Sequence, residues 1–104
     1  MSDMRIFSRH TFKVIREEYP RAAPALGEWY RETEQAKWRT PQDVKAKYPK
    51  ASIVANDRVV FNIMGGEYRL IAGMEYEFGA VYIKFFGTHA EYDKVDAATV
   101  ELRK

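Results

Sequence analysis

The shortness of the turns in the second half of the chain constrains its fold most. Asn56 and Asp57 separate two apolar runs, Gly65 and Gly66 separate the next pair, and residues 77–79 separate the last. Parallel strands need a crossover of about a dozen residues or more, so these turns permit only antiparallel pairing. The sequence therefore predicts an antiparallel meander with strands at residues 51–55, 58–64, 67–76 and 80–86.

The first half of the chain carries helical patterns instead. Apolar side chains recur at helical spacing from Phe12 to Tyr19 and again from Ala22 to Thr33. Ser8 is the expected N-cap of the first helix. We expect helices at residues 9–18, at about 21–37 and from Pro41, after the N-cap Thr40, to Tyr48. Residues 5–7 indicate an edge strand or an extended arm, and residues 96–104 have weak helical character.

These elements predict an α+β domain: an antiparallel β-sheet meander with an N-terminal helical hairpin packed on one face. With 104 residues, the chain is expected to form one domain spanning residues 1–104. Alternation along each strand then separates the two faces of the sheet. The predicted helix-facing residues are Val60, Leu70, Ile83 and Phe85, and the predicted cations of the open face are Arg69 and Lys84.

The composition excludes several classes of protein. There is no cysteine, and therefore neither a disulfide nor a thiolate metal site. No apolar run approaches the ~20 residues that span a bilayer, and the first residues lack the pattern of a signal peptide. We expect a cytoplasmic protein without a cofactor, a bound metal or a membrane partner. The net charge of +2, from 17 basic and 15 acidic side chains, leaves open a basic face or an evenly solvated surface.

Residues 81–94 join an apolar strand to a run of ionisable side chains. Gly87 is expected to let the backbone bend, so that the side chains after it lie on a loop leaving a rigid strand, where functional groups are often found. His89 is the strongest candidate for proton transfer, because imidazole exchanges protons near neutral pH. The alternative is a histidine that only stabilises the turn. Asp93 either acts as a base or orients His89, and the sequence leaves its role open.

The sequence of residues 87–94 (GTHAEYDK), together with residues 59–63 (VVFNI) and 68–70 (YRL), resembles the HigB group of bacterial toxins. These are RelE-like mRNA interferases of toxin–antitoxin systems. The resemblance extends to residues 4–6 (MRI) and 38–41 (WRTP), so it covers nearly the whole chain.

The resemblance implies a ribosome-dependent endoribonuclease that cuts mRNA on the ribosome. It also implies a HigA-like helix-turn-helix antitoxin as partner, with DNA reached only through that antitoxin. Attack of a ribose 2′-OH on the adjacent phosphate needs a base, cations and an acid. It needs no metal, and His10 and His89 are too few for a histidine-rich metal site.

On this interpretation, the cations and rings near residues 81–94 acquire roles. Arg69 is a candidate phosphate clamp, unless it is a surface arginine paired with Glu67 or Glu75. Lys84 is a cation at the phosphate or a lysine whose stem packs on the sheet. Tyr92 stacks on a base, orients the phosphate or anchors the last loop. The candidate catalytic residues are His89, Arg69, Lys84 and Tyr92, and the candidate RNA-binding residues are Lys45, Lys47, Arg58 and Lys94.

Two other functions compete with the enzyme. One is a non-catalytic α+β RNA-binding module in which Tyr68, Tyr82 and Phe86 stack on bases. The other is a structural partner that assembles through an exposed apolar face. Substitution of His89 or Arg69 separates the first two functions, because it should abolish cleavage by an enzyme but only weaken binding by a module.

Overall fold

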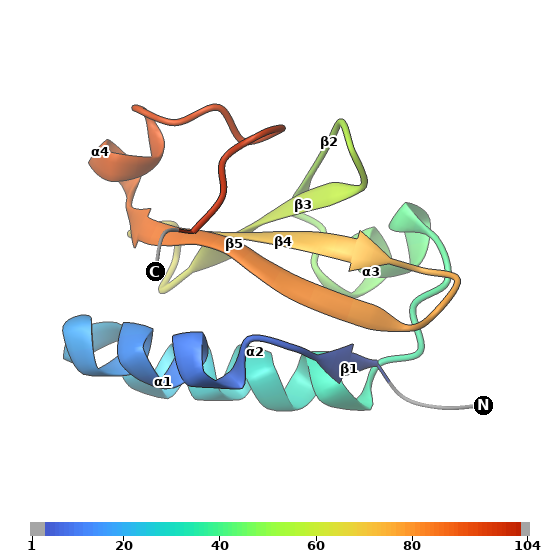
Figure 1. The fold of residues 1–104 in the computed structure, drawn as a ribbon, viewed down its shortest axis with the longest axis horizontal. Helices are drawn as coiled ribbons and strands as arrows, with labels where there is room; N and C mark the ends of the chain where they lie inside the picture. The colour runs from blue at the N-terminus through green and yellow to red at the C-terminus, as the bar shows by residue number, and fades with distance from the viewer. Residues whose placement is uncertain (1–3, 103–104) are drawn as a thin grey trace.

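The computed structural model describes residues 4–102, and helices cover one face of a five-stranded sheet (Figure 1). The predicted α+β architecture, with an N-terminal helical hairpin under the sheet, is confirmed. The helices are α1 (Arg9–Glu18), α2 (Ala23–Gln35), α3 (Pro41–Lys47) and α4 (His89–Tyr92), with a 3-10 turn at Pro20–Ala22. The strands are β1 (Arg5–Ile6), β2 (Ser52–Val54), β3 (Arg58–Ile63), β4 (Tyr68–Glu75) and β5 (Ala80–Thr88).

The sheet has the order β1-β5-β4-β3-β2, and β2 to β5 form the predicted antiparallel meander. The short strand β1 extends it at the edge by pairing with β5 in parallel, so the sheet is mixed. Backbone bonds hold this edge at either end of β1, where Arg5 N–H donates to the Gly79 carbonyl at 2.7 Å and Phe7 N–H to the Val81 carbonyl at 2.9 Å. The expected N-terminal edge strand is therefore confirmed.

Aromatic rings form the centre of the core between the sheet and the helices. Phe61 on β3 is fully buried, and its ring centroid lies 5.5 Å from that of Trp29 on α2 and 5.2 Å from that of Tyr48 after α3. Trp38 stacks on the Phe61 ring, with the two ring centroids 6.3 Å apart. One residue of the sheet thus holds α2 and the segment around α3 together, and offset or edge contacts of this kind add to the burial of apolar area.

The predicted facing of the sheet is correct for Leu70 and Ile83, which belong to the helix-side core, but wrong for Phe85. Ala72 pairs with Ile83 and Ile71 pairs with Phe85, so Lys84 is an extra residue in β5. Such a β-bulge shifts the alternation by one position. Phe85 therefore lies on the open face, and Phe86 replaces it in the helix-side core.

The prediction for Val60 is also wrong. Val59, Phe61 and Ile63 belong to the helix-side core, so alternation places Val60 on the other face, opposite Ile71. Val60 is nevertheless buried. Val59, Val60 and Phe61 are consecutive, apolar and all buried, so this run does not alternate, which explains why alternation alone did not fix the phase of this strand.

Several predicted boundaries change for local reasons. Ser8 precedes α1 but is left-handed (φ 70°) and makes no side-chain cap bond. The expected tight turn at Gly65 and Gly66 is a longer loop over residues 64–67, in which Met64 also has a positive φ of 55°. Residues 96–102 form turns rather than a helix, and residues 103–104 lie outside the described part. Within residues 4–102, no helix combines the length and apolar character that a membrane span requires.

We expect Phe61→Ala to lower the free energy of unfolding by about 3–5 kcal/mol, because it leaves a cavity among the core rings. The control is Asn62→Ala, at the next, exposed position of β3, where the change should stay within about 0.5 kcal/mol. Urea titration followed by tryptophan fluorescence measures both values. Similar losses for the two variants would contradict the central place given to Phe61.

Candidate active site

The short helix α4 forms where the sequence predicted a loop, and a capping box explains it. The Glu91 amide donates to the Thr88 hydroxyl oxygen at 3.1 Å, and the Thr88 amide donates to the Glu91 carboxylate at 2.7 Å. These reciprocal bonds satisfy donors that the start of a helix otherwise leaves unpaired. Within the run GTHAEYDK, Thr88 and Glu91 therefore have a structural role.

Glu91 also ties α4 to the helix layer. Its carboxylate accepts a bond from the Tyr19 hydroxyl at 3.1 Å, and the Tyr19 ring packs edge-on against Tyr68 and Phe86. The bond from the Thr88 amide lowers the pKa of Glu91, whereas burial, reinforced by Glu91, raises the pKa of Tyr19 to about 12. The pair is therefore a carboxylate with a neutral phenol at physiological pH, which is the state that makes this bond.

His89, Tyr92 and Asp93 lie on one side of α4, because residues three and four positions apart are neighbours on a helix. Nδ1 of His89 lies 3.2 Å from Oδ2 of Asp93, and both side chains are more than half exposed. A carboxylate at Nδ1 favours the tautomer with the proton on that nitrogen and leaves Nε2 as an acceptor. The geometry thus supports the second of the two roles considered for Asp93, the orientation of His89.

Arg69 lies beside α4, because it pairs with Gly87 across β4 and β5. Its guanidinium carbon is 5.7 Å from the centre of the Tyr92 ring, and Nη1 donates to the Gly66 carbonyl. Glu67, one of the partners considered for Arg69, pairs instead with Arg21 at 3.0 Å. The structure therefore brings Arg69, Tyr92 and His89 together at one end of the open face. Arg69 thus lies on the face of the sheet that was predicted for it.

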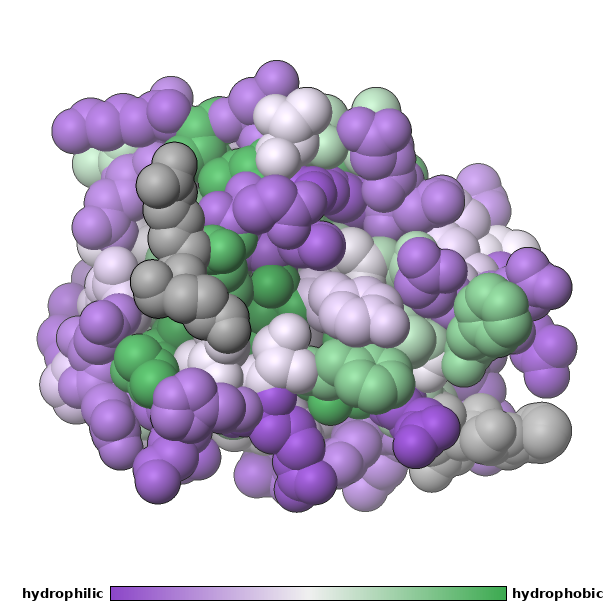
Figure 2. Space-filling view, in the orientation of Figure 1, coloured by the Kyte–Doolittle hydropathy of each residue, from purple (hydrophilic) through white to green (hydrophobic). Residues whose placement is uncertain are grey.

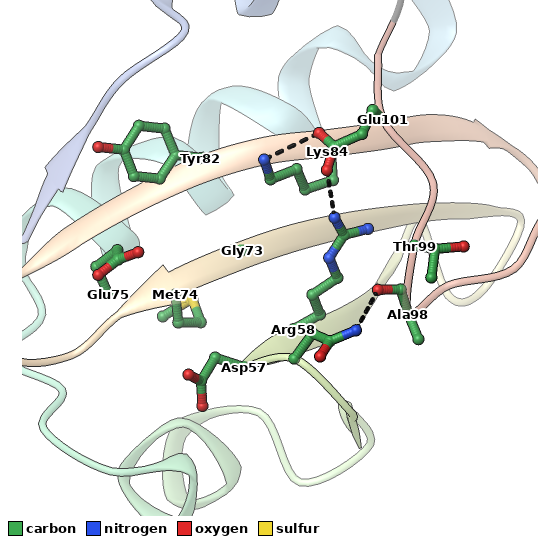
Figure 3. Close-up of a pocket in the computed structure, with 11 residues that line it drawn as sticks. Asp57, Arg58, Gly73, Met74, Glu75, Tyr82, Lys84, Ala98, Thr99 and Glu101 are labelled. Carbon is green, nitrogen blue, oxygen red and sulfur yellow. Dashed lines mark hydrogen bonds and ion pairs between the residues drawn. The ribbon is translucent and has the colours of Figure 1, made fainter.

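Lys84 also lies on the open face, but in a different group (Figure 3). Its ammonium is 3.0 Å from the Glu101 carboxylate, which also lies 2.6 Å from Nη2 of Arg58. The three side chains border an open pocket of about 620 Å³. Lys84 precedes Gly87 by three positions in β5, roughly 10 Å along the strand, so it is separate from the group at α4.

The other predicted RNA-binding lysines have different surroundings. Lys45 donates to the carbonyls of Pro49 and Ala51 at 2.7 and 2.8 Å, and Lys47 lies 3.9 Å from Glu32. Both belong to α3, which Figure 1 shows at the opposite end of the molecule from α4. Lys94 instead follows α4 directly and is exposed. Of these lysines, Lys94 alone lies next to the α4 group.

Sequence reasoning missed Glu101 and the capping box for different reasons. The pattern Thr88-x-x-Glu91 is a recognisable helix-start signal, whereas nothing local marks Glu101 as the partner of Arg58 and Lys84.

Hydrophilic side chains surround apolar ones on the molecular face seen in Figure 2. Among residues 4–102, no group of three or more His, Cys, Asp or Glu side chains is arranged to hold a metal.

Comparisons with known proteins connect this arrangement to a family. A profile described as the HigB toxin, a RelE-like toxic component of a toxin–antitoxin system, matches residues 22–95. The mRNA interferase HigB of Escherichia coli O6:H1 (strain CFT073) is 29% identical over 94 residues, which are 88% of this chain and 91% of that protein. The mRNA interferase toxin HigB of Escherichia coli K12 is 27% identical over 92 residues, with 86% and 88% covered. The mRNA interferase HigB of Shigella flexneri matches with the same identity and coverage.

We expect Gly87→Ala to loosen α4, because an added Cβ would lie 2.7 Å from Oε1 of Glu91 and 2.9 Å from the Phe85 ring. Amide hydrogen exchange at Thr88 and Glu91 should accelerate, and stability should fall by about 1–3 kcal/mol. Gly27→Ala on α2 is the control, since the added Cβ would lie 3.9 Å from Nη1 of Arg31, an ordinary van der Waals distance. It should stabilise the protein by about 0.5–1 kcal/mol. Unchanged exchange in Gly87→Ala would contradict the need for a glycine beside the capping box.

Proposed function

The chain belongs to the HigB family of RelE-like toxins, and on this premise we propose that it is an mRNA endoribonuclease of a toxin–antitoxin system. The observation that carries the proposal is the grouping of Arg69, His89 and Tyr92 on the open face, with Asp93 beside the imidazole. A base, a cation and a hydroxyl in one exposed place are the groups that attack by a ribose 2′-OH requires.

In the proposed reaction, Nε2 of His89 takes the proton of the 2′-OH. The 2′ oxygen then bonds to the adjacent phosphorus while the bond from phosphorus to the 5′ oxygen breaks, which yields a cyclic phosphate and a 5′-hydroxyl end. Asp93 holds the imidazole at Nδ1, 3.2 Å away, and stabilises its protonated form. The contact therefore serves both the orientation and the charge of the base.

Arg69 would neutralise the charge that builds up on the phosphoryl oxygens. Its guanidinium is fixed from two sides, by the Gly66 carbonyl and by the Tyr92 ring, so little reorganisation is needed when charge develops. The Tyr92 phenol is the proposed donor to the leaving 5′ oxygen. Proton exchange through solvent, from the imidazolium to the phenolate, then restores both side chains.

The remaining parts of the proposal concern the surroundings of the reaction. We assign the proton transfers to side chains and therefore propose cleavage without a metal. Lys84 and Lys94 would bind neighbouring phosphates of the RNA backbone, a contribution that weakens with salt. The substrate in this proposal is mRNA on the ribosome, and the partner that neutralises the toxin is a helix-turn-helix antitoxin, as the resemblance implies.

The non-catalytic RNA-binding module is less compatible with the geometry. Tyr68 and Phe86, which were to stack on bases, are buried at 7% and 6% exposure and stack on each other at 5.5 Å in the helix-side core. Of that trio only Tyr82 lies on the open face. The side chains accessible at α4 are ionisable groups suited to proton transfer, which favours the enzyme.

We expect His89→Ala to fold but to lose RNA cleavage and growth arrest, because the 2′-OH would lose its base. Loss of a general base typically costs about 10²–10⁴-fold in rate. The measurement is induced expression in a bacterium with mapping of mRNA ends, together with circular dichroism of the purified variant.

His10→Ala is the matched control. His10 is exposed on α1, so this substitution removes the same side chain from the helix layer. It should keep full toxicity. Growth arrest by a folded His89→Ala variant equal to that of the His10→Ala variant would reject the proposed base.

A further inference from the structure

Glu101 lies in the segment for which the sequence predicted only weak helical character, and its carboxylate bridges two cations of the open face. Oε1 is 3.0 Å from the Lys84 ammonium and Oε2 is 2.6 Å from Nη2 of Arg58 (Figure 3). A guanidinium and an ammonium that converge on two oxygens of one anion are the arrangement that also binds a phosphate. We infer that Arg58 and Lys84 form a phosphate-binding subsite for RNA, which the Glu101 carboxylate occupies until RNA displaces it.

The exposure of the three side chains supports displacement. The Arg58 side chain is 7% exposed and that of Lys84 26%, but that of Glu101 is 60% exposed. The carboxylate therefore covers the solvent-facing end of two otherwise shielded cations. An anion from solution can take its place without uncovering the apolar part of the sheet.

The backbone of residues 95–101, here called the C-terminal segment, is held independently of the Glu101 side chain. Nη1 of Arg58 donates to the carbonyls of Ala97 and Val100 at 3.2 and 2.5 Å, and the Asn56 amide donates to the Ala98 carbonyl at 2.9 Å. Rotation of one exposed side chain is thus sufficient to open the subsite. The segment itself remains as one wall of the pocket.

The rings beside the subsite indicate which phosphate it takes. Tyr82 lines the same pocket and stacks on Phe7 at 5.1 Å with only 12° between the ring planes. The Lys84 ammonium is 5.8 Å from the centre of the Tyr82 ring. A flat aromatic surface next to a phosphate site suits a nucleotide of single-stranded RNA, whose base stacks while its phosphate pairs.

The Glu101 carboxylate is negatively charged at neutral pH, so it competes with RNA phosphates for Arg58 and Lys84. The hydrogen bond from Lys84 lowers the pKa of this carboxyl, so it stays ionised well below neutrality. The inference rests on the proposed function, because it places the subsite for a neighbouring nucleotide along the sheet from the α4 group. Beyond that function, the inference means that the Glu101 carboxylate of the free toxin weakens the binding of RNA to the same protein.

The test measures binding rather than cleavage. All variants carry His89→Ala, and the probe is a short fluorescent single-stranded RNA titrated by anisotropy at several salt concentrations. In the parent protein, which carries only His89→Ala, an RNA phosphate that binds to Arg58 and Lys84 replaces the Glu101 carboxylate that is already bound there. Glu101→Gln should bind more tightly at low salt, and its plot of log K against log salt should be steeper by about 0.7, the value for one added phosphate contact on a single strand.

Glu17→Gln on α1 is the control, because it removes the same charge from an exposed position on the helix layer. It should leave the salt slope unchanged. Equal affinity and slope for Glu101→Gln and Glu17→Gln would overturn the inference. Adding Lys84→Gln to Glu101→Gln should cancel the gain, and a gain that persists without Lys84 would also count against the subsite.

The two proposals fail in different ways. If the wild-type chain cuts mRNA but Glu101→Gln binds like the control, the subsite is wrong and the nuclease stands. If Glu101→Gln shows the steeper salt dependence but the wild-type chain leaves mRNA intact, the subsite stands and the nuclease is wrong.

Discussion

The extra residue in β5 is the constraint on which the two faces of this protein depend. Without the bulge at Lys84, strict alternation would send Phe85 into the helix-side core and Phe86 to the open face. With it, Ile83 and Phe86 both face the helices while Lys84 and Phe85 both face away. The Lys84 stem lies across Gly73, where an added Cβ would lie 3.0 Å from Cε. The irregularity in the ladder therefore completes the helix-side core with Phe86 in place of Phe85.

A second dependence connects the core to the proposed catalytic residues through Glu91. The core rings of Tyr68 and Phe86 position Tyr19, Tyr19 donates to Glu91, and Glu91 caps α4. The orientation of His89 and Tyr92 thus follows from aromatic packing beneath the other face of the sheet. Side chains on rigid, capped elements hold a reactive geometry better than side chains on free loops, which explains why a helix of a single turn is tied down so thoroughly.

The sequence predicted what local patterns determine and missed what long-range pairing determines. The turn at Asn56, the capping of α3 by Thr40 and the open-face position of Arg69 all follow from local rules, and the structure confirms them. Phe85 and Val60 were misplaced because a bulge and a strand buried on both faces break simple alternation. Glu101 was invisible because its partners are distant in the chain, at Arg58 and Lys84.

The pairing of charges on the open face explains why a net charge of +2 is a poor guide to RNA binding. Arg58 and Lys84 both meet Glu101, so part of the positive charge is neutralised within the molecule. This carboxylate also fixes the position of both cations, and a cation that is already ordered loses less entropy when a phosphate arrives. In the proposed displacement, an incoming phosphate has to replace the paired Glu101 carboxylate, which makes this site more selective than an uncovered pair of cations. For the proposed toxin, the arrangement of paired charges therefore matters more than their sum.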